Sequence, residues 1–350
     1  MGTPVKKGSL KVDLSFVYKC VREILRHTKK KKIIITKSTV PVGTGDEIEK
    51  ILKKKKKLFS VISNPEFLRE GEAIRDFRYP DRIVIGSDNK NEFKTMRKLY
   101  SPLISKGAKF FTTSRKGAEL IKYASNAFLA TKITFINEIA NLCETAGINI
   151  EDISVGMGSD ARIGSRFLRA GPAYGGSCFP KDTKGLVSIA DKFKSNLSIV
   201  KSVIKSNQNR KILLTKRVLK IMNNKIKNKK IAVLGVTFKA NTDDMRESSS
   251  LVLIPYLLKK GAKVSYHDPS GPKNEFGKKK NLNFASSINK ACQGADLIII
   301  NTEWDEFKSI DFKKIVKKSN FKIYDMRNLY NPIELKKRNI KYYSVGRSKL

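Results

Sequence analysis

Apolar residues recur along this chain at helical and strand spacings in turn, and the alternation predicts an α/β fold. Val17, Val21 and Ile24 fall on one helical stripe, and a short apolar run after them predicts a buried strand. In the first part of the chain the pattern predicts helices over 13–27, 46–52 and 91–100 and strands over 33–36, 58–63 and 82–86. Such alternation is typical of a parallel sheet with crossover helices.

Polar motifs follow the first two predicted strands. One runs from Lys37 to Thr39 and the other from Asn64 to Gly71. Ligands of parallel α/β sheets bind at the carboxyl ends of the strands. We therefore expect both segments to contribute to a ligand site.

A long helix is predicted over residues 114–146, which contain no proline. Its apolar residues, among them Phe128 and Ile136, cover more of the circumference than one stripe. A helix of this kind is buried on more than one side. It is expected to form an interdomain spine or a dimer interface.

The second half of the chain predicts a second α/β unit. A glycine-rich and charged segment, 156–176, is expected to form a substrate loop, and 182–222 is predicted to be helical before a polar linker at 223–225. Strands are then predicted over 230–235, 264–267 and 297–300, helices over 248–260 and 288–293, and a mobile surface loop over 271–283. The predicted fold class is α/β, with two Rossmann-like α/β domains, the first incomplete, joined by a long central helix and a helical dimerisation region. The expected domains are 1–113, 114–222 and 223–350.

The charge balance is the unusual feature of the composition. Lys and Arg number 72 against 32 Asp and Glu, which gives a formal net charge of +40. Clustered lysines can neutralise nucleic-acid phosphates, but the lysine runs lie scattered at 29–32, 53–57, 227–230 and 278–280 without interleaved aromatics. Solvated faces explain them more simply. We expect no nucleic-acid partner, and a basic RNA-binding protein stays as an outside alternative.

Hydropathy and cysteine usage indicate a cytoplasmic protein. No apolar run approaches the roughly 20 residues that cross a bilayer, and the first residues do not open a signal peptide. The chain has four cysteines, Cys20, Cys143, Cys178 and Cys292, without paired metal-ligand spacing. We expect no membrane association, no disulfide and no metal.

Cys178 stands in the segment Gly175-Gly176-Ser177-Cys178-Phe179-Pro180-Lys181-Asp182. The paired glycines let backbone approach a ligand closely, and a cation and a carboxylate follow the sulfur within four residues. A thiolate is the reactive form of cysteine. A lone cysteine is more often a small buried hydrophobe, and Asp182 alone could be a helix cap, but the segment as a whole favours a nucleophile.

Acid-base chemistry has little histidine to draw on. The two histidines, His27 and His267, are expected to be structural. Lys122 and Asn126 stand four residues apart on the predicted long helix, so both can reach one site. A lysine on an apolar helix is often only extended toward solvent, which leaves its function open from spacing alone.

Four segments in one order resemble the UDP-glucose 6-dehydrogenase family. They are Lys37–Gly43, Asn64–Gly71, Glu119–Asn126 and Gly175–Asp182. The resemblance implies an NAD-dependent oxidoreductase that oxidises UDP-glucose twice, to UDP-glucuronate, and that forms a homodimer. NAD is the implied cofactor and UDP-glucose the implied substrate.

The resemblance also implies roles for individual residues. Cys178 would capture the intermediate aldehyde as a thiohemiacetal, which the second oxidation turns into a thioester. Asp182, with Lys122 and Asn126, would activate water, Lys122 would stabilise the oxyanion, and Glu66 would serve as the acid-base carboxylate.

Binding residues are implied in the same way. The implied cofactor contacts are Thr3, Thr39, Glu70, Lys181 and Arg246. The implied substrate contacts are Glu66, Phe67, Leu68, Arg69, Glu70, Lys122, Asn126, Arg162, Phe167, Leu168, Arg169, Ala170, Gly171, Gly175, Phe238, Lys239 and Arg327. Arg162 resembles an arginine that the family delivers from the neighbouring subunit.

The chain departs from the family in one respect. No Gly-x-Gly-x-x-Gly follows a predicted strand, since Gly156-Met157-Gly158 lacks the third glycine and Gly235 is single. The chain is therefore expected to be N-terminally truncated, as a shortened reading frame or as a nucleotide-sugar binder with impaired NAD use. GDP-mannose 6-dehydrogenase and a non-catalytic UDP-sugar-binding dimer are the alternatives, and Phe179 with residues 301–305 favours UDP-glucose.

Overall fold

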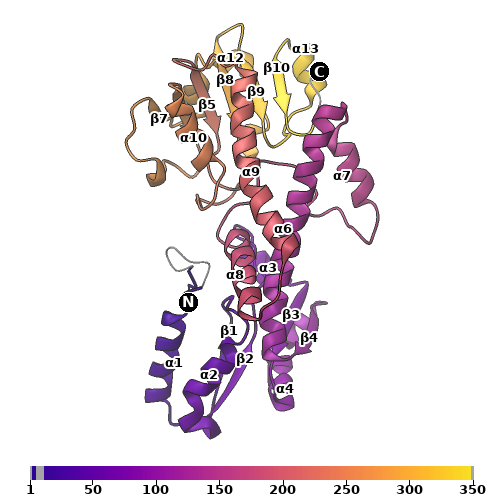
Figure 1. The fold of residues 1–350 in the computed structure, drawn as a ribbon, viewed down its shortest axis with the longest axis vertical. Coiled ribbons are helices and arrows are strands. Elements are labelled where there is room, and N and C mark those ends of the chain that lie inside the picture. The colour runs from indigo at the N-terminus through magenta and orange to yellow at the C-terminus, as the bar shows by residue number, and fades with distance from the viewer. Residues whose placement is uncertain (1, 5–11, 348–350) are drawn as a thin grey trace. The chain divides into compact units, whose positions relative to one another are not determined.

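The computed structural model describes residues 2–4 and 12–347 and divides into two compact units. The first unit contains Met1–Phe128 and Lys181–Val200, and the second contains Leu129–Pro180 and Lys201–Leu350. Each unit is built around its own sheet (Figure 1). The predicted α/β class is confirmed.

The first unit has a four-stranded sheet in the order β1-β2-β3-β4. Its strands are β1 Lys32–Thr36, β2 Phe59–Ser63, β3 Arg82–Gly86 and β4 Lys109–Thr113, and its helices are α1 Ser15–His27, α2 Thr44–Leu52, α3 Ala73–Arg78, α4 Lys90–Leu99 and α5 Ser101–Ile104, with a 3-10 segment over Lys53–Leu58. β1 pairs with β2 and β3 with β4 in parallel, as the alternation predicts. β2 and β3 pair antiparallel. They pair at one position, Ser63 with Gly86, and the connection between them contains the short helix α3.

Buried aliphatic side chains hold the first unit together. Val17 and Val21 on α1 pack with Ile48 and Leu52 on α2 and with Val61 on β2. Burying each such side chain contributes about 1.5–3 kcal/mol. The other face of the sheet has its own cluster around Ile62, Ile83, Ile85, Met96 and Ala108.

The second unit has a six-stranded, all-parallel sheet in the order β10-β9-β8-β5-β6-β7. The strands are β5 Lys230–Leu234, β6 Lys263–His267, β7 Leu282–Phe284, β8 Leu297–Ile300, β9 Lys322–Asp325 and β10 Lys341–Ser344, and the connecting helices include α10 Ser250–Lys259, α11 Ile288–Cys292, α12 Phe312–Val316 and α13 Pro332–Lys337. From the central strand β5 the sheet extends to one side through β6 and β7 and to the other side through β8, β9 and β10. This doubly wound order places ligands beyond the carboxyl ends of the central strands.

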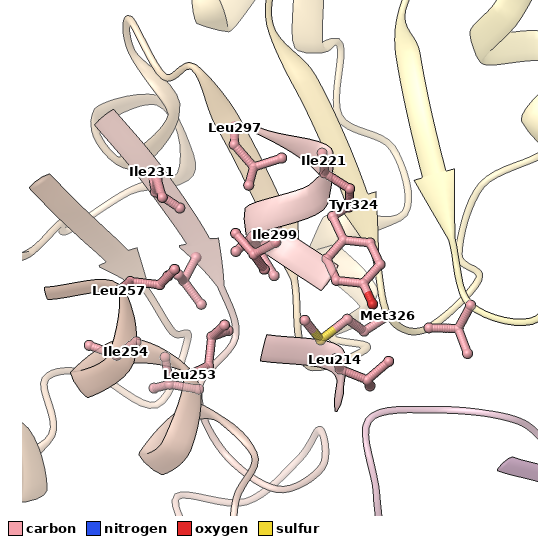
Figure 2. Close-up of a cluster of buried hydrophobic side chains, with 14 of the residues drawn as sticks. Leu214, Ile221, Ile231, Leu253, Ile254, Leu257, Leu297, Ile299, Tyr324 and Met326 are labelled. Carbon is pink, nitrogen blue, oxygen red and sulfur yellow. The ribbon is translucent and has the colours of Figure 1, made fainter. Parts of the chain in front are cut away.

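A large apolar core covers one face of this sheet. Figure 2 shows Ile231 and Ile299 on the strands facing Leu253 and Leu257 of α10, with Leu214 of the helix α9 (Ser198–Ile221) beside Met326. The segment 271–283, expected to be a mobile loop, contains the 3-10 turn Asn274–Phe276, and Phe276 is buried in this core. An aromatic side chain buried there ties the segment to the sheet.

Four further helices lie between the two sheets in the chain order. They are α6 Arg115–Ala146, α7 Ile150–Gly158, α8 Phe179–Lys192 and α9 Ser198–Ile221. The prediction of one helical stretch over 182–222 was wrong, since α8 and α9 are separated at 193–197, where Lys194 has a φ of 55°. The predicted loop at 156–176 is likewise helical at its start, in α7. Within residues 2–4 and 12–347, no helix is long and apolar enough to cross a membrane.

Candidate active site

The segment after β2 is anchored by its first residue. Asn64 is buried, and its Nδ2 donates to the Val84 carbonyl at 2.9 Å while its Oδ1 accepts from Tyr100 Oη at 2.6 Å. Lys37 Nζ lies 3.4 Å from the same Oδ1. Burial lowers the pKa of Lys37, and the negative charge of Glu66 acts in the opposite direction. The two motifs that follow β1 and β2 therefore meet at the carboxyl edge of this parallel pair.

Phe67 in this segment carries two cations on its ring. The Arg82 guanidinium lies 4.0 Å and the Lys122 ammonium 5.1 Å from the ring centroid. Cation–π contacts gain strength when they are shielded from water, and Lys122 is buried. The ring thus orients a lysine that the sequence singled out, while Leu68 beside it is half-buried.

Asn126 and Asp182 form the most buried polar pair at the predicted catalytic positions. Asn126 Nδ2 donates to Asp182 Oδ2 at 2.6 Å, and Lys181 Nζ donates to Oδ1 at 2.6 Å. Asp182 is 1% exposed. Lys122 lies one turn before Asn126 on α6, so the structure brings the predicted residues of the first unit to one region.

The other charged residues of the segment after β2 differ in exposure and in pairing; they are Glu66, Arg69 and Glu70. Glu66 is exposed and Glu70 half-buried. Arg69 is held by Asp76, to which its backbone N–H donates at 2.8 Å and its Nη2 at 2.6 Å. This hydrogen bond holds the pKa of Asp76 below its usual range. Both the backbone N–H and the side chain of Arg69 therefore bind Asp76, which closes the segment on itself.

Thr3 and Thr39, both predicted to contact the cofactor, are neighbours. Thr3 Oγ1 donates to the Thr39 carbonyl at 3.0 Å. Thr39 lies just beyond the carboxyl end of β1.

Sequence reasoning missed the role of Glu119, although it quoted this residue in a motif. The Glu119 carboxylate accepts from the Gly43 and Gly45 N–H groups at 2.7 and 2.8 Å and so caps the N-terminus of α2. Burial raises the pKa of Glu119, while these backbone hydrogen bonds lower it. A glutamate on a helix 70 or so residues away gives no local capping signal, since caps are sought next to the helix they serve.

Cys178, which belongs to the second unit, is exposed and directly precedes α8 in the chain, and the first turn of α8 carries Asp182. The Cys178 Sγ lies 3.6 Å from Ser177 Oγ. Phe167 has a φ of 67° and packs its ring 6.2 Å from that of Phe179. Leu168 and Ala170 are buried beside it. The segment 167–178 is therefore a packed loop that presents the thiol.

Helices α6 and α9 hold this loop through buried polar side chains. The Gly171 N–H donates to Asn137 Oδ1 at 2.8 Å, and Arg210 Nε donates to the Gly171 carbonyl at 3.2 Å. Burial lowers the pKa of Arg210 to about 10. Asn137 and Arg210 lie in segments predicted to be helical, but neither residue stands in one of the four motifs, so this support became visible only in the structure.

The paired glycines face the segment after β5. A Cβ built on Gly175 would lie 2.8 Å from the Glu247 carbonyl oxygen, and one on Gly176 would lie 2.7 Å from the Phe238 ring. Lys239 Nζ lies 5.9 Å from the centroid of the Phe238 ring. Glycine is required at Gly175 by the close approach of the Glu247 backbone, and at Gly176 by the Phe238 ring and by a φ of 77°.

Arg327, beyond the carboxyl end of β9, is fixed by carbonyl oxygens. Its Nε donates to Asn301 O and its Nη2 to Phe238 O, both at 2.9 Å. Glu303 lies 2.7 Å from Nε, and burial lowers the pKa of Arg327 while this carboxylate opposes the shift. Arg169 Nη2 donates to the Arg327 carbonyl at 3.2 Å. The predicted substrate residues of the second unit thus gather at the switch point of its sheet.

Two arginine side chains are paired with carboxylates two residues away in their own segments. Arg246 forms a two-pronged pair with Asp244, at 2.8 Å from Nη2, and its side chain is 66% exposed. Arg162 pairs with Asp160 at 2.6 Å and is 90% exposed. Both guanidinium groups lie where a bound anion could compete with the carboxylate.

Comparison with known proteins identifies the family. Three family models match in order: the UDP-glucose/GDP-mannose dehydrogenase family NAD binding domain over residues 1–104, central domain over 116–209 and UDP binding domain over 232–332. UDP-glucose 6-dehydrogenase of Rhizobium meliloti (strain 1021) is 46% identical over 354 residues, covering 99% of this chain and 80% of that protein. YwqF of Bacillus subtilis (strain 168), also named UDP-glucose 6-dehydrogenase, is 41% identical and covers 99% and 79%. A UDP-glucose dehydrogenase structure from Pyrobaculum islandicum matches with a TM-score of 0.87 and 31% identity, over 99% of this chain and 78% of that one.

These matches correct one expectation. The truncation of the NAD-binding region is not borne out, because the family's NAD binding domain matches from residue 1 to residue 104. The parallel edge at Thr39 and Asn64 fits a dinucleotide, since it supplies backbone groups at strand ends where such ligands bind. NAD is thus the cofactor that the match indicates. With its NAD-binding, central and UDP-binding domains all matched in order, the chain belongs to the UDP-glucose/GDP-mannose dehydrogenase family.

Proposed function

We propose that this chain oxidises the C6 alcohol of UDP-glucose twice, to UDP-glucuronate, with NAD⁺ as oxidant. The observation that carries the proposal is the exposed Cys178 placed directly before α8, whose first turn carries the buried Asp182 bonded to Asn126. Relatives 46% and 41% identical are named UDP-glucose 6-dehydrogenase.

The proposed chemistry runs through the sulfur of Cys178. Two NAD⁺ molecules, bound one after the other, would supply the hydride acceptors, one for each oxidation. The first removes a hydride and a proton from the C6 alcohol and leaves an aldehyde, to whose carbon the Cys178 thiolate adds. Loss of a second hydride and proton from this thiohemiacetal gives a thioester, and water then cleaves the carbon–sulfur bond to release the carboxylate and the thiol.

Lys122, Asn126 and Asp182 support these steps. The Lys122 ammonium, oriented over Phe67, stabilises the negative oxygen of the tetrahedral adducts. Asp182, whose carboxylate accepts from both Asn126 and Lys181, orients the hydrolytic water. Glu66 is exposed and serves as the acid-base carboxylate.

The second unit is proposed to bind the nucleotide sugar. Arg327, Arg169 and Lys239 supply positive charge near the Phe238 backbone, and arginine suits a diphosphate because its fork donates parallel hydrogen bonds. Thr3, Thr39, Glu70, Lys181 and Arg246 would hold NAD. The segment 167–171 and Gly175 would border the sugar.

We further propose a cytoplasmic homodimer in which Arg162 reaches the neighbouring subunit's substrate. Its side chain is 90% exposed and is paired within its own chain to Asp160, two residues away. A long cationic side chain on an exposed loop can bind an anion outside its own subunit.

The function is tested by following NADH with purified protein and UDP-glucose. We expect two NADH per UDP-glucuronate formed and little turnover of GDP-mannose. Turnover of GDP-mannose in place of UDP-glucose would transfer the proposal to that substrate. Binding of UDP-glucose without NADH formation would favour the non-catalytic dimer.

A further inference from the structure

The loop that presents Cys178 is held from α9 and from residues 246–247. Asn207 on α9 accepts from the Tyr174 N–H at 2.9 Å and donates to the Tyr174 carbonyl at 3.0 Å. The Gly176 N–H then donates to the Arg246 carbonyl at 2.8 Å. The backbone just before Cys178 is therefore fixed on both sides of Gly175.

Glu247, beside this contact, has an unusual backbone. Its φ is 56°, in the left-handed region that side chains other than glycine rarely adopt. Its carbonyl oxygen would lie 2.8 Å from a Cβ on Gly175. A shift of Glu247 toward an ordinary conformation would thus move the surface against which Gly175 packs.

The Glu247 side chain is anchored by the buried face of α9. Lys211 Nζ lies 2.7 Å from Glu247 Oε2, and Gln208 Nε2 donates to the same oxygen at 3.3 Å. The Lys211 side chain is 2% exposed and that of Glu247 is 32% exposed. Removing either partner of a buried ion pair leaves a charge uncompensated. The pair therefore has the geometry to keep Glu247 in its strained conformation.

We propose that Lys211 and Glu247 are positioning residues for Cys178. Their ion pair holds residues 246–247 in the conformation on which Gly175 and Gly176 rest, and this sets where the sulfur is presented. Neither residue is assigned a contact with substrate or cofactor, and both act through the loop. The inference rests on the proposed function only in taking Cys178 as the nucleophile.

The test compares Lys211→Met with Lys211→Arg and with Lys205→Met, a control at an exposed lysine on the same helix. Two quantities are measured: hydrogen–deuterium exchange of the peptide that contains Tyr174 and Gly176, and kcat and KM for UDP-glucose. In Lys211→Met we expect exchange of this peptide to rise at least tenfold and kcat to fall at least tenfold, with KM changed less than threefold. Lys211→Arg keeps the positive charge, so it should restore most of the slow exchange and most of kcat. Lys205→Met should match the wild type in both quantities.

Glu247→Gln serves as a second variant because it removes the charge and keeps the shape. We expect the same local increase in exchange as in Lys211→Met. Unchanged exchange and kcat in Lys211→Met and Glu247→Gln would overturn the proposal. The proposal would also be overturned if exchange rose equally across the whole second unit while kcat per folded molecule stayed constant. If the wild type does not oxidise UDP-glucose, the proposed function fails, but the exchange comparison still decides whether the pair holds the loop.

Discussion

At the scale of single residues, the nucleophilic role proposed for Cys178 is one that a hydroxyl cannot fill. A serine hydroxyl ionises far less readily than a thiol near neutral pH, and an ester is a poorer acyl intermediate for hydrolysis than a thioester. Cys178→Ser should therefore lose formation of the acid while it retains UDP-glucose binding, because the exposed sulfur contributes little to holding the nucleotide. Calorimetry with UDP-glucose measures whether binding is retained, and mass spectrometry of the trapped acyl-enzyme measures whether the covalent intermediate still forms. Full acid formation by the serine variant would mean that Cys178 is not the nucleophile.

Lys122 should matter for both oxidation and hydrolysis. Lys122→Ala removes the charge placed over Phe67, and losing one preorganised oxyanion donor costs on the order of 10²-fold or more in kcat. Phe67→Leu keeps the lysine and removes only the ring, so a smaller loss is expected. Steady-state NADH production measures both. A larger loss in the Phe67 variant than in the Lys122 variant would show that the ring acts in another way.

Residues within the four quoted motifs could be singled out from sequence, whereas their supports could not. Cys178, Lys122, Asn126 and Asp182 stand in short segments of distinctive composition. Lys211 and Glu247 are 36 positions apart and become partners only when α9 and the segment after β5 fold together. The residue types Arg-Glu-Ser at 246–248 carry no pairing information.

At the scale of elements, Gly175 is required by the close approach of the Glu247 backbone and Gly176 by that of the Phe238 ring. Gly175→Ala would place a Cβ 2.8 Å from the Glu247 carbonyl oxygen, and overpacking of this kind costs about 1–3 kcal/mol. Gly156→Ala in α7 is the matched control, since a Cβ there meets nothing within 4 Å. It should stabilise the protein by about 0.5–1 kcal/mol, because alanine favours a helix over glycine. Urea midpoints measure both, and equal midpoints for the two variants would contradict the close approach.

The segment 64–76 should respond to acid through one ion pair. Arg69 lowers the pKa of Asp76, so this carboxylate contributes stability above its unfolded pKa of about 3.9 and loses it as the pH falls through the lower folded value. Because the Arg69 side chain is 51% exposed, the contribution is about 0.2–1 kcal/mol. Asp76→Asn should lower the free energy of unfolding at pH 7 by that amount and not at pH 2. Urea titrations at both pH values check this, and a deficit of the same size at pH 2 would assign the effect to something other than the charge.

Element prediction was most accurate where apolar runs were continuous, although β2 and β6, which contain serines, were also found. β5 and β8 are fully apolar beyond their first residues and were found within one residue of their ends. β9 and β10 mix lysine, tyrosine and polar residues and were missed. The break between α8 and α9 was missed because a lysine, Lys194, adopts the left-handed conformation that glycine or asparagine usually signals.

At the scale of the whole molecule, the net charge of +40 bears on association more than on folding. Such a field attracts anionic nucleotides and is screened by salt. We expect the KM for UDP-glucose to rise as ionic strength increases from 0.01 to roughly 0.15 M, where the screening length falls from about 30 to about 8 Å. Initial rates in NaCl measure it. A KM independent of salt would show that the scattered lysines do not steer the substrate.

The proposed dimer has a defined surface on α6. Phe128, Phe135 and Leu142 recur every seven residues and are 66%, 46% and 60% exposed, so they form one apolar stripe along the helix. Ile136, which the sequence suggested as an interface residue, is fully buried, and its substitution would unfold the protein rather than test the contact. Phe128→Glu should weaken the dimer by on the order of 2 kcal/mol, as for a central aromatic anchor, which is about 30-fold in Kd.

Sedimentation velocity from 0.1 to tens of micromolar measures this shift. Ile333→Glu on α13 is the control, since Ile333 is also apolar and 58% exposed but lies on another element. It should sediment as the wild type does. If the wild type is a monomer at tens of micromolar, or if both variants dissociate equally, the stripe on α6 is not the interface, and Arg162 must then act within its own subunit or not at all.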